Sequence, residues 1–202
     1  MPSTARTHEV CPFTIIVDTR EQAPFRFTGI KSDAAQKYRP IQIETVRRSL
    51  PTGDYSIVGM EDLISIERKS KSDFYACCGR ERDRFVRELE RLNKIKYAHV
   101  MIEASLEELA TEPPIHSRLK GTSAVRSIFA WSIDFPNIHF HNPQGRLLAE
   151  RATFRLLSFA YDRQEKMQKG LKDGHQEVGP VVRQTGLART QAPDSRLVGS
   201  SR

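Results

Sequence analysis

Carboxylates and basic side chains gather in a short stretch, from Gly53 to Asp73, in a pattern that suits metal-assisted chemistry on a phosphate. Asp54 opens a short β-like run, and Glu67 and Lys69 end the next one. Residues two apart on a strand point to the same face, so Glu67 and Lys69 are predicted to lie side by side. A hairpin between the two runs would bring Asp54 next to them. Two carboxylates can hold a hard divalent cation, and a nearby lysine can orient or activate a water.

A second charged group follows the first apolar run of the chain, residues 13–18, which is predicted to be a buried strand. Asp18, Arg20 and Glu21 stand where this strand ends, and the Glu–Arg–Lys triplet ends another strand. Open α/β sheets bind their ligands at the ends of strands, so charge at two strand ends is typical of a catalytic cleft. A solvated hairpin edge with a surface ion pair is the simpler interpretation of a short D…ExK pattern.

Strand-like and helix-like segments alternate along the rest of the chain. Apolar or alternating runs predict strands at residues 13–18, 41–46, 55–58, 63–69, 97–103 and 138–141. Helical spacing of apolar residues predicts helices within 80–94, after Ser105, at 122–133, and from 144 to about 169. A further short helix is predicted with Ser72 as its N-cap, and Ser105 with Glu108 is predicted to form a capping box. These elements predict an α/β fold with a central mixed β-sheet flanked by helices on both faces.

Composition predicts the domain limits and the kind of partner. Residues 1–12 are interpreted as a flexible arm, 13–169 as the globular domain, and 170–202 as a basic, disordered tail. The net charge of +7 favours an anionic partner such as nucleic acid. Apolar runs of about 18 residues, long enough to span a membrane, are absent. Three cysteines without a zinc-like pattern favour a reducing compartment, the cytoplasm or, in a eukaryote, the nucleus.

The charged stretch resembles the nuclease domain of the XPF-type structure-specific endonucleases. The family signature GDxₙERKxxxD is matched at every fixed position, which are Gly53, Asp54, Glu67, Arg68, Lys69 and Asp73. An upstream element of the family is matched at Val17, Asp18, Arg20 and Glu21. The resemblance covers roughly residues 13 to 165. It implies a restriction-endonuclease-like fold and cleavage of DNA near branch points, flaps or single-strand/double-strand junctions, with magnesium or manganese.

The resemblance also implies a metal site. Asp54 and Glu67 would be the principal ligands of Mg²⁺ or Mn²⁺, together with the backbone carbonyl of Arg68 and waters. Asp18 would line the same pocket as a supporting or additional ligand. Magnesium keeps several of its waters, which suits so few protein ligands.

The remaining matched residues would act on the water and the phosphate. Lys69 would orient or deprotonate the attacking water and stabilise charge on the phosphate. Arg20 would contact the phosphate, because a guanidinium fork suits phosphate oxygens. Glu21, Arg68 and Asp73 would support these groups, with Asp73 forming an ion pair to Lys69 or Arg20. For each of the three, a structural salt bridge stays open beside a direct role. In the catalytic set we therefore place Asp18, Arg20, Asp54, Glu67, Lys69 and Asp73.

DNA contacts are expected from four arginines, which are Arg20, Arg68, Arg80 and Arg84. The last two begin an arginine-rich helix, for which solvated pairs with glutamates at i, i+4 spacing are the alternative interpretation.

Two other functions stay open at this point. The chain could be a non-catalytic DNA-binding partner subunit, because some members of the family pair an active chain with a degenerate one. It could also be a restriction or recombination nuclease of the same broad fold. The stretch after residue 169 is too short for the tandem helix-hairpin-helix domain that many members carry, which leaves a homodimer or another protein partner open.

Overall fold

The structure is a computed structural model that describes residues 9–31 and 40–174. The chain divides into two compact units, Met1–Glu165 and Lys166–Arg202. In the second unit the described residues, 166–174, are the last turns of a helix. Among the described residues, none of the helices is both long and apolar enough to cross a membrane.

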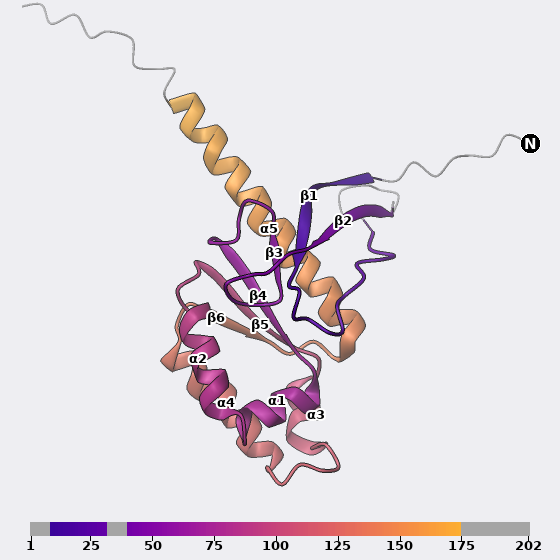
Figure 1. Ribbon diagram of the computed structural model, residues 1–202, viewed down its shortest axis with the longest axis vertical. Helices are drawn as coiled ribbons and strands as arrows, with labels where there is room; N and C mark the ends of the chain where they lie inside the picture. The colour runs from indigo at the N-terminus through magenta and orange to yellow at the C-terminus, as the bar shows by residue number, and fades with distance from the viewer. Residues whose placement is uncertain (1–8, 32–39, 175–202) are drawn as a thin grey trace, which may run out of the picture. The chain divides into compact units, whose positions relative to one another are not determined.

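Six strands and five helices follow one another in the described part of the chain (Figure 1). In chain order they are β1 (Glu9–Val17), β2 (Ile41–Arg47), β3 (Tyr55–Ile57), β4 (Ile64–Lys69), α1 (Lys71–Cys78), α2 (Arg82–Leu92), β5 (Tyr97–Ile102), α3 (Leu106–Thr111), α4 (Gly121–Asp134), β6 (Ile138–His141) and α5 (Gly145–Gly174). The strands form one sheet in the order β2-β1-β3-β4-β5-β6. Strand β3 is antiparallel to both of its neighbours, and the other pairs are parallel, so the predicted mixed sheet is confirmed.

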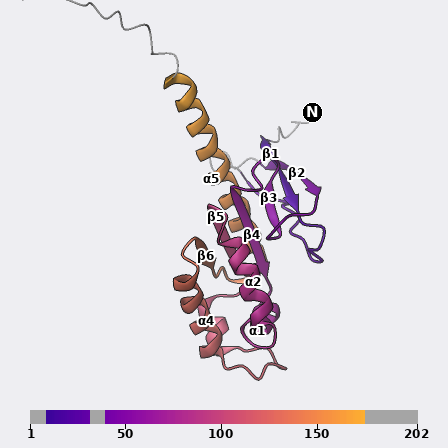
Figure 2. The same ribbon diagram turned by 60° about the vertical axis from the view of Figure 1, so that its left-hand side comes forward.

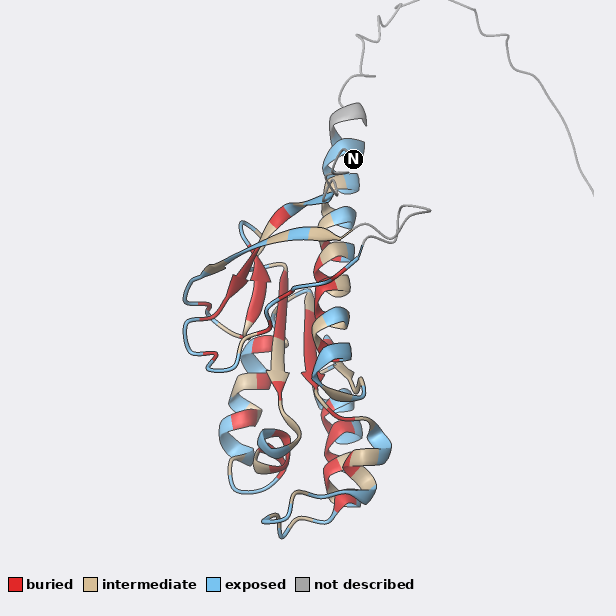
Figure 3. Ribbon diagram, turned by 90° about the vertical axis from the view of Figure 1, so that its right-hand side faces the viewer, coloured by how far each residue is buried: buried red, intermediate tan, exposed pale blue. Residues whose placement is uncertain are grey.

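Helices cover both faces of this sheet, as the alternation of elements predicts. On β5, Val100 points into a core that also contains Phe85 of α2 and Trp131 of α4. The next residue, Met101, points to the opposite face and packs in a second core with Leu157 of α5. Figure 2 shows α1, α2 and α4 grouped beside β4 to β6, and Figure 3 shows the buried strands between helical layers.

The first strand is longer than the sequence predicts. It begins at Glu9, so the last part of the predicted arm, residues 9–12, is strand. Glu9 and Val10 are exposed, so these two residues do not continue the buried apolar pattern from which the strand at 13–18 is predicted. Their backbones are nevertheless in register with Ile41 and Gln42 of β2. The rest of the predicted arm lies outside the described residues.

Helix limits also differ in two places. The N-cap of α1 is Ser70 and not Ser72, because the Ser70 side chain accepts the backbone N–H of Asp73. Helix α5 continues to Gly174, past the predicted end of the domain at residue 169. The remainder of the predicted tail lies outside the described residues. The capping box at the start of α3 is confirmed.

A tight approach of backbone to strand fixes the residue before β3. Gly53 has φ +75°, and a Cβ built on it would lie 2.1 Å from the hydroxyl oxygen of Ser65. A side chain is therefore excluded both by conformation and by space. The next residue, Asp54, donates its backbone N–H to the carbonyl of Ile66 at 2.9 Å. The antiparallel pair thus brings Asp54 beside the charged end of β4, as predicted.

Candidate active site

A cleft of about 540 Å³ opens where β4 ends and α1 begins. Its lining contains most of the residues that the sequence singles out, namely Arg20, Glu21, Asp54, Glu67, Arg68, Lys69, Asp73 and Arg84. Asp18 and Arg80 are not among the lining residues. Segments far apart in the chain therefore meet at one end of the central strands, where an open α/β sheet is expected to place its ligand.

Two carboxylates, Asp54 and Glu67, lie in this cleft, and of the two only Glu67 forms an ion pair within the described residues, with Lys69. Asp54 accepts the backbone N–H of Arg68 through Oδ2 at 2.7 Å. Burial and, after it, the negative charge of Glu67 together raise the pKa of Asp54 to about 8. Burial also raises the pKa of Glu67, against the opposing effect of Lys69. A divalent cation held between the two would remove this repulsion.

The donor set fits magnesium better than a softer metal. Among residues 9–31 and 40–174 there is no group of three or more His, Cys, Asp or Glu side chains that could hold an ion. A cation in the cleft would depend on Asp54 and Glu67, on backbone oxygen and on water. Such a small set of hard oxygen ligands suits Mg²⁺, which retains much of its hydration.

Lys69 is a buried ammonium whose neighbours keep it charged. Its Nζ forms an ion pair with Oε1 of Glu67, lies 3.4 Å from Oε2 of Glu88, and stands 5.1 Å from the centre of the Phe85 ring. Burial alone would lower the pKa of Lys69, but the Glu67 carboxylate and then Glu88 outweigh it, so the pKa is raised. A group that holds its proton this firmly donates hydrogen bonds. This favours the first of its two predicted roles, orienting a water, over deprotonating it.

Asp18 lies behind Arg20 and holds it in place. Its Oδ1 accepts from the Arg20 backbone N–H at 2.8 Å and from Arg20 Nε at 2.7 Å. Its Oδ2 accepts from Arg20 Nη2 at 3.1 Å and from the Leu50 N–H at 2.6 Å. Burial opposes these bonds, yet the net pKa of Asp18 is lowered. Because both oxygens are engaged, the geometry does not support the predicted metal ligation and assigns Asp18 to positioning.

Arg20 itself faces the cleft, as predicted for a phosphate contact. Its side chain is 65% exposed although it makes two bonds to Asp18 and one to the Leu50 carbonyl, at 2.8 Å. These bonds use Nε and Nη2. They fix the guanidinium plane and leave Nη1 for a phosphate oxygen.

Arg68 points to the opposite face of β4 from Glu67 and Lys69. Its guanidinium makes a two-point pair with Glu103, at 2.7 and 3.1 Å, and lies 3.3 Å from Glu21. Only 9% of the side chain is exposed. The predicted DNA contact by this side chain is therefore not supported, because two carboxylates already surround it. Metal ligation by the backbone carbonyl of Arg68 stays a prediction, because this placement concerns only the side chain.

This placement can be tested by replacing Arg68 with methionine. The change leaves Glu21 buried without its cation and Glu103 with Arg146 alone, which costs about 3 kcal/mol or more of unfolding free energy. Urea denaturation monitored by circular dichroism measures the loss. Arg48→Met is the matched control, because Arg48 pairs with Glu61 at the surface and its loss costs about 1 kcal/mol at most. Equal stability losses in the two variants would contradict a structural role for Arg68.

The three remaining predicted residues lie at the edge of the cleft or outside it. Asp73 accepts the Ser70 hydroxyl at 2.6 Å and so supports the start of α1, and its predicted ion pair with Lys69 or Arg20 is not found in the described chain. Arg84 is exposed, lines the cleft and pairs with Glu81 at 2.6 Å. Arg80 is exposed as well, but it lines a different pocket that borders α1.

Two glutamates of the site were not selected from the sequence. Glu88 approaches Lys69, and Glu103 pairs with both Arg68 and Arg146. Each carries a signal that could have been used. Glu88 lies three residues after Phe85, beside the buried stripe of its helix, and Glu103 stands directly after a buried strand.

Comparisons with known proteins agree with the predicted fold. A family model described as ERCC4 domain matches residues 17–145. Among solved structures, the chain is similar to "XPF from Aeropyrum pernix, complex with DNA", with a TM-score of 0.51 and 20% sequence identity. The similarity covers 76% of this chain and 66% of that one, so the chain spans slightly less than two thirds of that protein's length. No curated protein matches the chain.

Proposed function

The chain belongs to the ERCC4 domain family, and from this membership and the geometry of the cleft we propose that it is a metal-dependent DNA endonuclease. The observation that carries the proposal is the convergence of Asp54, Glu67 and Lys69 in one cleft. The family match confirms the resemblance to the XPF-type nuclease domain. The neighbouring structure is a complex with DNA, which supports DNA as the substrate.

Asp54 and Glu67 would hold Mg²⁺ or Mn²⁺, with the Arg68 backbone carbonyl as a further oxygen ligand. Oδ1 of Asp54 and Oε2 of Glu67 are the oxygens that the described hydrogen bonds leave available. The bound cation would supply Lewis-acid activation of a phosphate oxygen and a lower pKa for a coordinated water. Asp18 contributes indirectly, by holding Arg20.

Lys69 and Arg20 would act on the phosphate and the attacking water. The Lys69 ammonium, fixed by Glu67 and Glu88, donates to the water or to a non-bridging phosphate oxygen as negative charge develops. Arg20 enters the cleft from the loop after β1 and offers its fixed guanidinium to the same phosphate. Arg84 at the rim would contact a neighbouring phosphate.

The substrate we propose is branched, flap or junction DNA, in repair or recombination. The cleft lies open at the end of the sheet, and the chain has a net charge of +7, which favours a polyanion. The family membership supports a DNA nuclease, and the choice among DNA structures is ours.

A cleavage panel tests this function directly. The full chain is incubated with end-labelled duplex, flap, fork and four-way-junction DNA in Mg²⁺ or Mn²⁺, and products are resolved on denaturing gels. We expect cutting of flap or fork DNA faster than of duplex, and no cutting in excess EDTA. Binding of all four substrates without cleavage in either metal would contradict the proposal and favour a non-catalytic partner subunit.

A further inference from the structure

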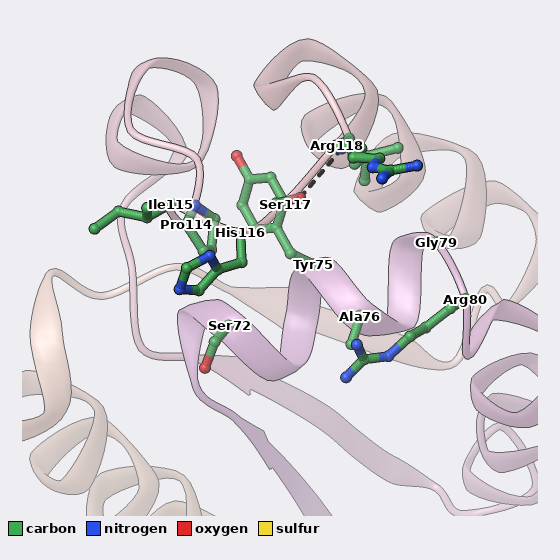
Figure 4. Close-up of a pocket in the computed structure, with 11 residues that line it drawn as sticks. Ser72, Tyr75, Ala76, Gly79, Arg80, Pro114, Ile115, His116, Ser117 and Arg118 are labelled. Carbon is green, nitrogen blue, oxygen red and sulfur yellow. Dashed lines mark hydrogen bonds between the residues drawn. The ribbon is translucent and has the colours of Figure 1, made fainter.

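A second pocket borders α1, and Figure 4 shows the residues that line it. It has a volume of about 610 Å³ and lies between α1 and the segment that joins α3 to α4. We call it the α1 pocket, lined by Ser72, Tyr75, Ala76, Gly79, Arg80 and residues 114–119. Ala76 lines both the α1 pocket and the cleft. A single helix therefore separates this cavity from the candidate active site.

The charged groups in this lining are positive. No aspartate or glutamate is among the lining residues, whereas Arg80 and Arg118 are. The Arg80 side chain is 82% exposed, and its Nε lies 3.6 Å from Oε1 of Glu81. Arg118 is exposed and makes no ion pair with a carboxylate in the described part of the chain. Two exposed cations in a lining that has no acidic residue attract an anionic ligand.

The rest of the lining is apolar and partly aromatic. Tyr75, Ala76, Pro114 and Leu119 form apolar walls, and Ile115 is 95% exposed. In Figure 4 the two arginines lie toward Gly79, whereas Ile115 and His116 lie at the other end, above Ser72. The pocket thus combines a cationic end with an apolar end. This combination suits a ligand that carries an anionic group and a flat apolar face.

We propose that the α1 pocket binds an unpaired nucleotide of the DNA strand that passes the cleft. This inference rests on the proposed function. The phosphate would meet Arg80 and Arg118, and the base would rest against Ile115 and the apolar wall. Pockets of about 300–1,000 Å³ hold ligands of this size. A duplex keeps its base faces stacked, so only a single-stranded segment can offer a base to the pocket.

The consequence is a preference for DNA with an unpaired arm. Phosphate contacts in the cleft can form with both paired and unpaired DNA. A base-binding pocket one helix away adds affinity only when a nucleotide is unpaired. The α1 pocket would thus contribute structure selectivity from within the nuclease domain itself.

A charge reversal at Arg118 tests the proposal. Fluorescence anisotropy measures binding of the full chain to labelled oligothymidylate and to a blunt duplex across a range of salt. Arg118→Glu should weaken oligothymidylate binding by about tenfold and reduce its salt dependence by about one phosphate contact, with a smaller effect on duplex. Arg151→Glu is the matched control, because Arg151 is exposed on α5 and lines neither cavity.

A second variant tests the contact with the base independently of the contact with the phosphate. Ile115→Ala removes an exposed side chain and should not disturb the fold. We expect oligothymidylate binding to weaken about threefold with an unchanged salt dependence, because an apolar contact to the base is lost and no charge changes.

The proposal is overturned if the wild-type chain does not bind oligothymidylate, if Arg118→Glu behaves like the control, or if it weakens duplex binding equally. Each of these results is independent of cleavage. A chain that binds single strands through the α1 pocket but cuts nothing would refute the proposed nuclease and not this site. A chain that cuts DNA with unaltered single-strand binding in Arg118→Glu would do the reverse.

Discussion

Replacement of Asp54 with asparagine should abolish DNA cleavage, by about a thousandfold or more, while the fold is retained. Asparagine has nearly the same shape, and its carbonyl oxygen can still accept the Arg68 N–H that now bonds to Oδ2. What it lacks is the negative charge that would bind the cation. Cleavage of labelled flap DNA in Mg²⁺, with circular dichroism as the check on folding, measures the effect. Asp62→Asn, at an exposed carboxylate outside the cleft, is the control and should cut normally.

The same substitution should stabilise the metal-free protein at alkaline pH. Burial and the nearby Glu67 raise the pKa of Asp54 to about 8 in the folded chain, above its ordinary value. Below that ordinary value both states hold the proton. As the pH rises from there through about 8, the unfolded chain releases its proton first, so unfolding of the wild type becomes easier. Asparagine has no proton to lose and escapes this effect.

Thermal melting in EDTA from about pH 5 to about pH 9 checks this sign. The melting temperature of Asp54→Asn minus that of the wild type should grow with pH. Added Mg²⁺ should reduce this difference in melting temperature, because a cation binds the wild-type carboxylate and stabilises only the wild type. If the wild type were more stable than Asp54→Asn at alkaline pH without metal, the result would contradict the raised pKa of Asp54 that burial and Glu67 cause.

The two-residue period of a strand is why the centre of the site could be predicted. Glu67 and Lys69 share a face of β4 because side chains alternate, and the ion pair between them confirms this. The same alternation sends Arg68 to the other face. Its partners, Glu21 and Glu103, come from the loop after β1 and the end of β5. Sequence spacing carries no information on which distant strand lies alongside, so the burial of Arg68 could not be predicted.

The partners of Asp18 and the exact start of α1 could not be predicted for a related reason. A motif shows that Asp18 and Arg20 are close in sequence, but not that the carboxylate also accepts the Leu50 N–H from a segment 32 residues away. Ser70 and Ser72 are equally good cap residues in the sequence, and the structure selects Ser70 because β4 ends one residue earlier. In both cases the choice depends on tertiary contacts that local patterns do not contain.

Replacement of Lys69 with methionine should separate metal binding from catalysis. Methionine keeps most of the apolar stem that packs near Phe85 but has no ammonium. We expect cleavage to fall by about a hundredfold or more, because the donor to the water or phosphate is gone. Binding of Mn²⁺, measured by titration calorimetry, should be equal to that of the wild type or tighter. The reason is that Lys69 occupies Oε1 of Glu67 in the metal-free chain and competes with a cation there.

The stability of this variant supplies an independent readout. Without its ammonium, Glu67 is a buried carboxylate that lacks a cation, so the metal-free variant should melt at a lower temperature than the wild type. A divalent cation replaces the missing charge, and the rise in melting temperature on adding Mn²⁺ should therefore be larger in Lys69→Met. Glu88→Gln is the matched control, since it removes the longer contact at 3.4 Å and keeps the ammonium on Glu67. Its cleavage should fall by about tenfold at most. Normal cleavage by Lys69→Met would show that the ammonium takes no part in catalysis. Loss of its Mn²⁺ binding would show that the ammonium maintains the cleft and does not only act beside the cation.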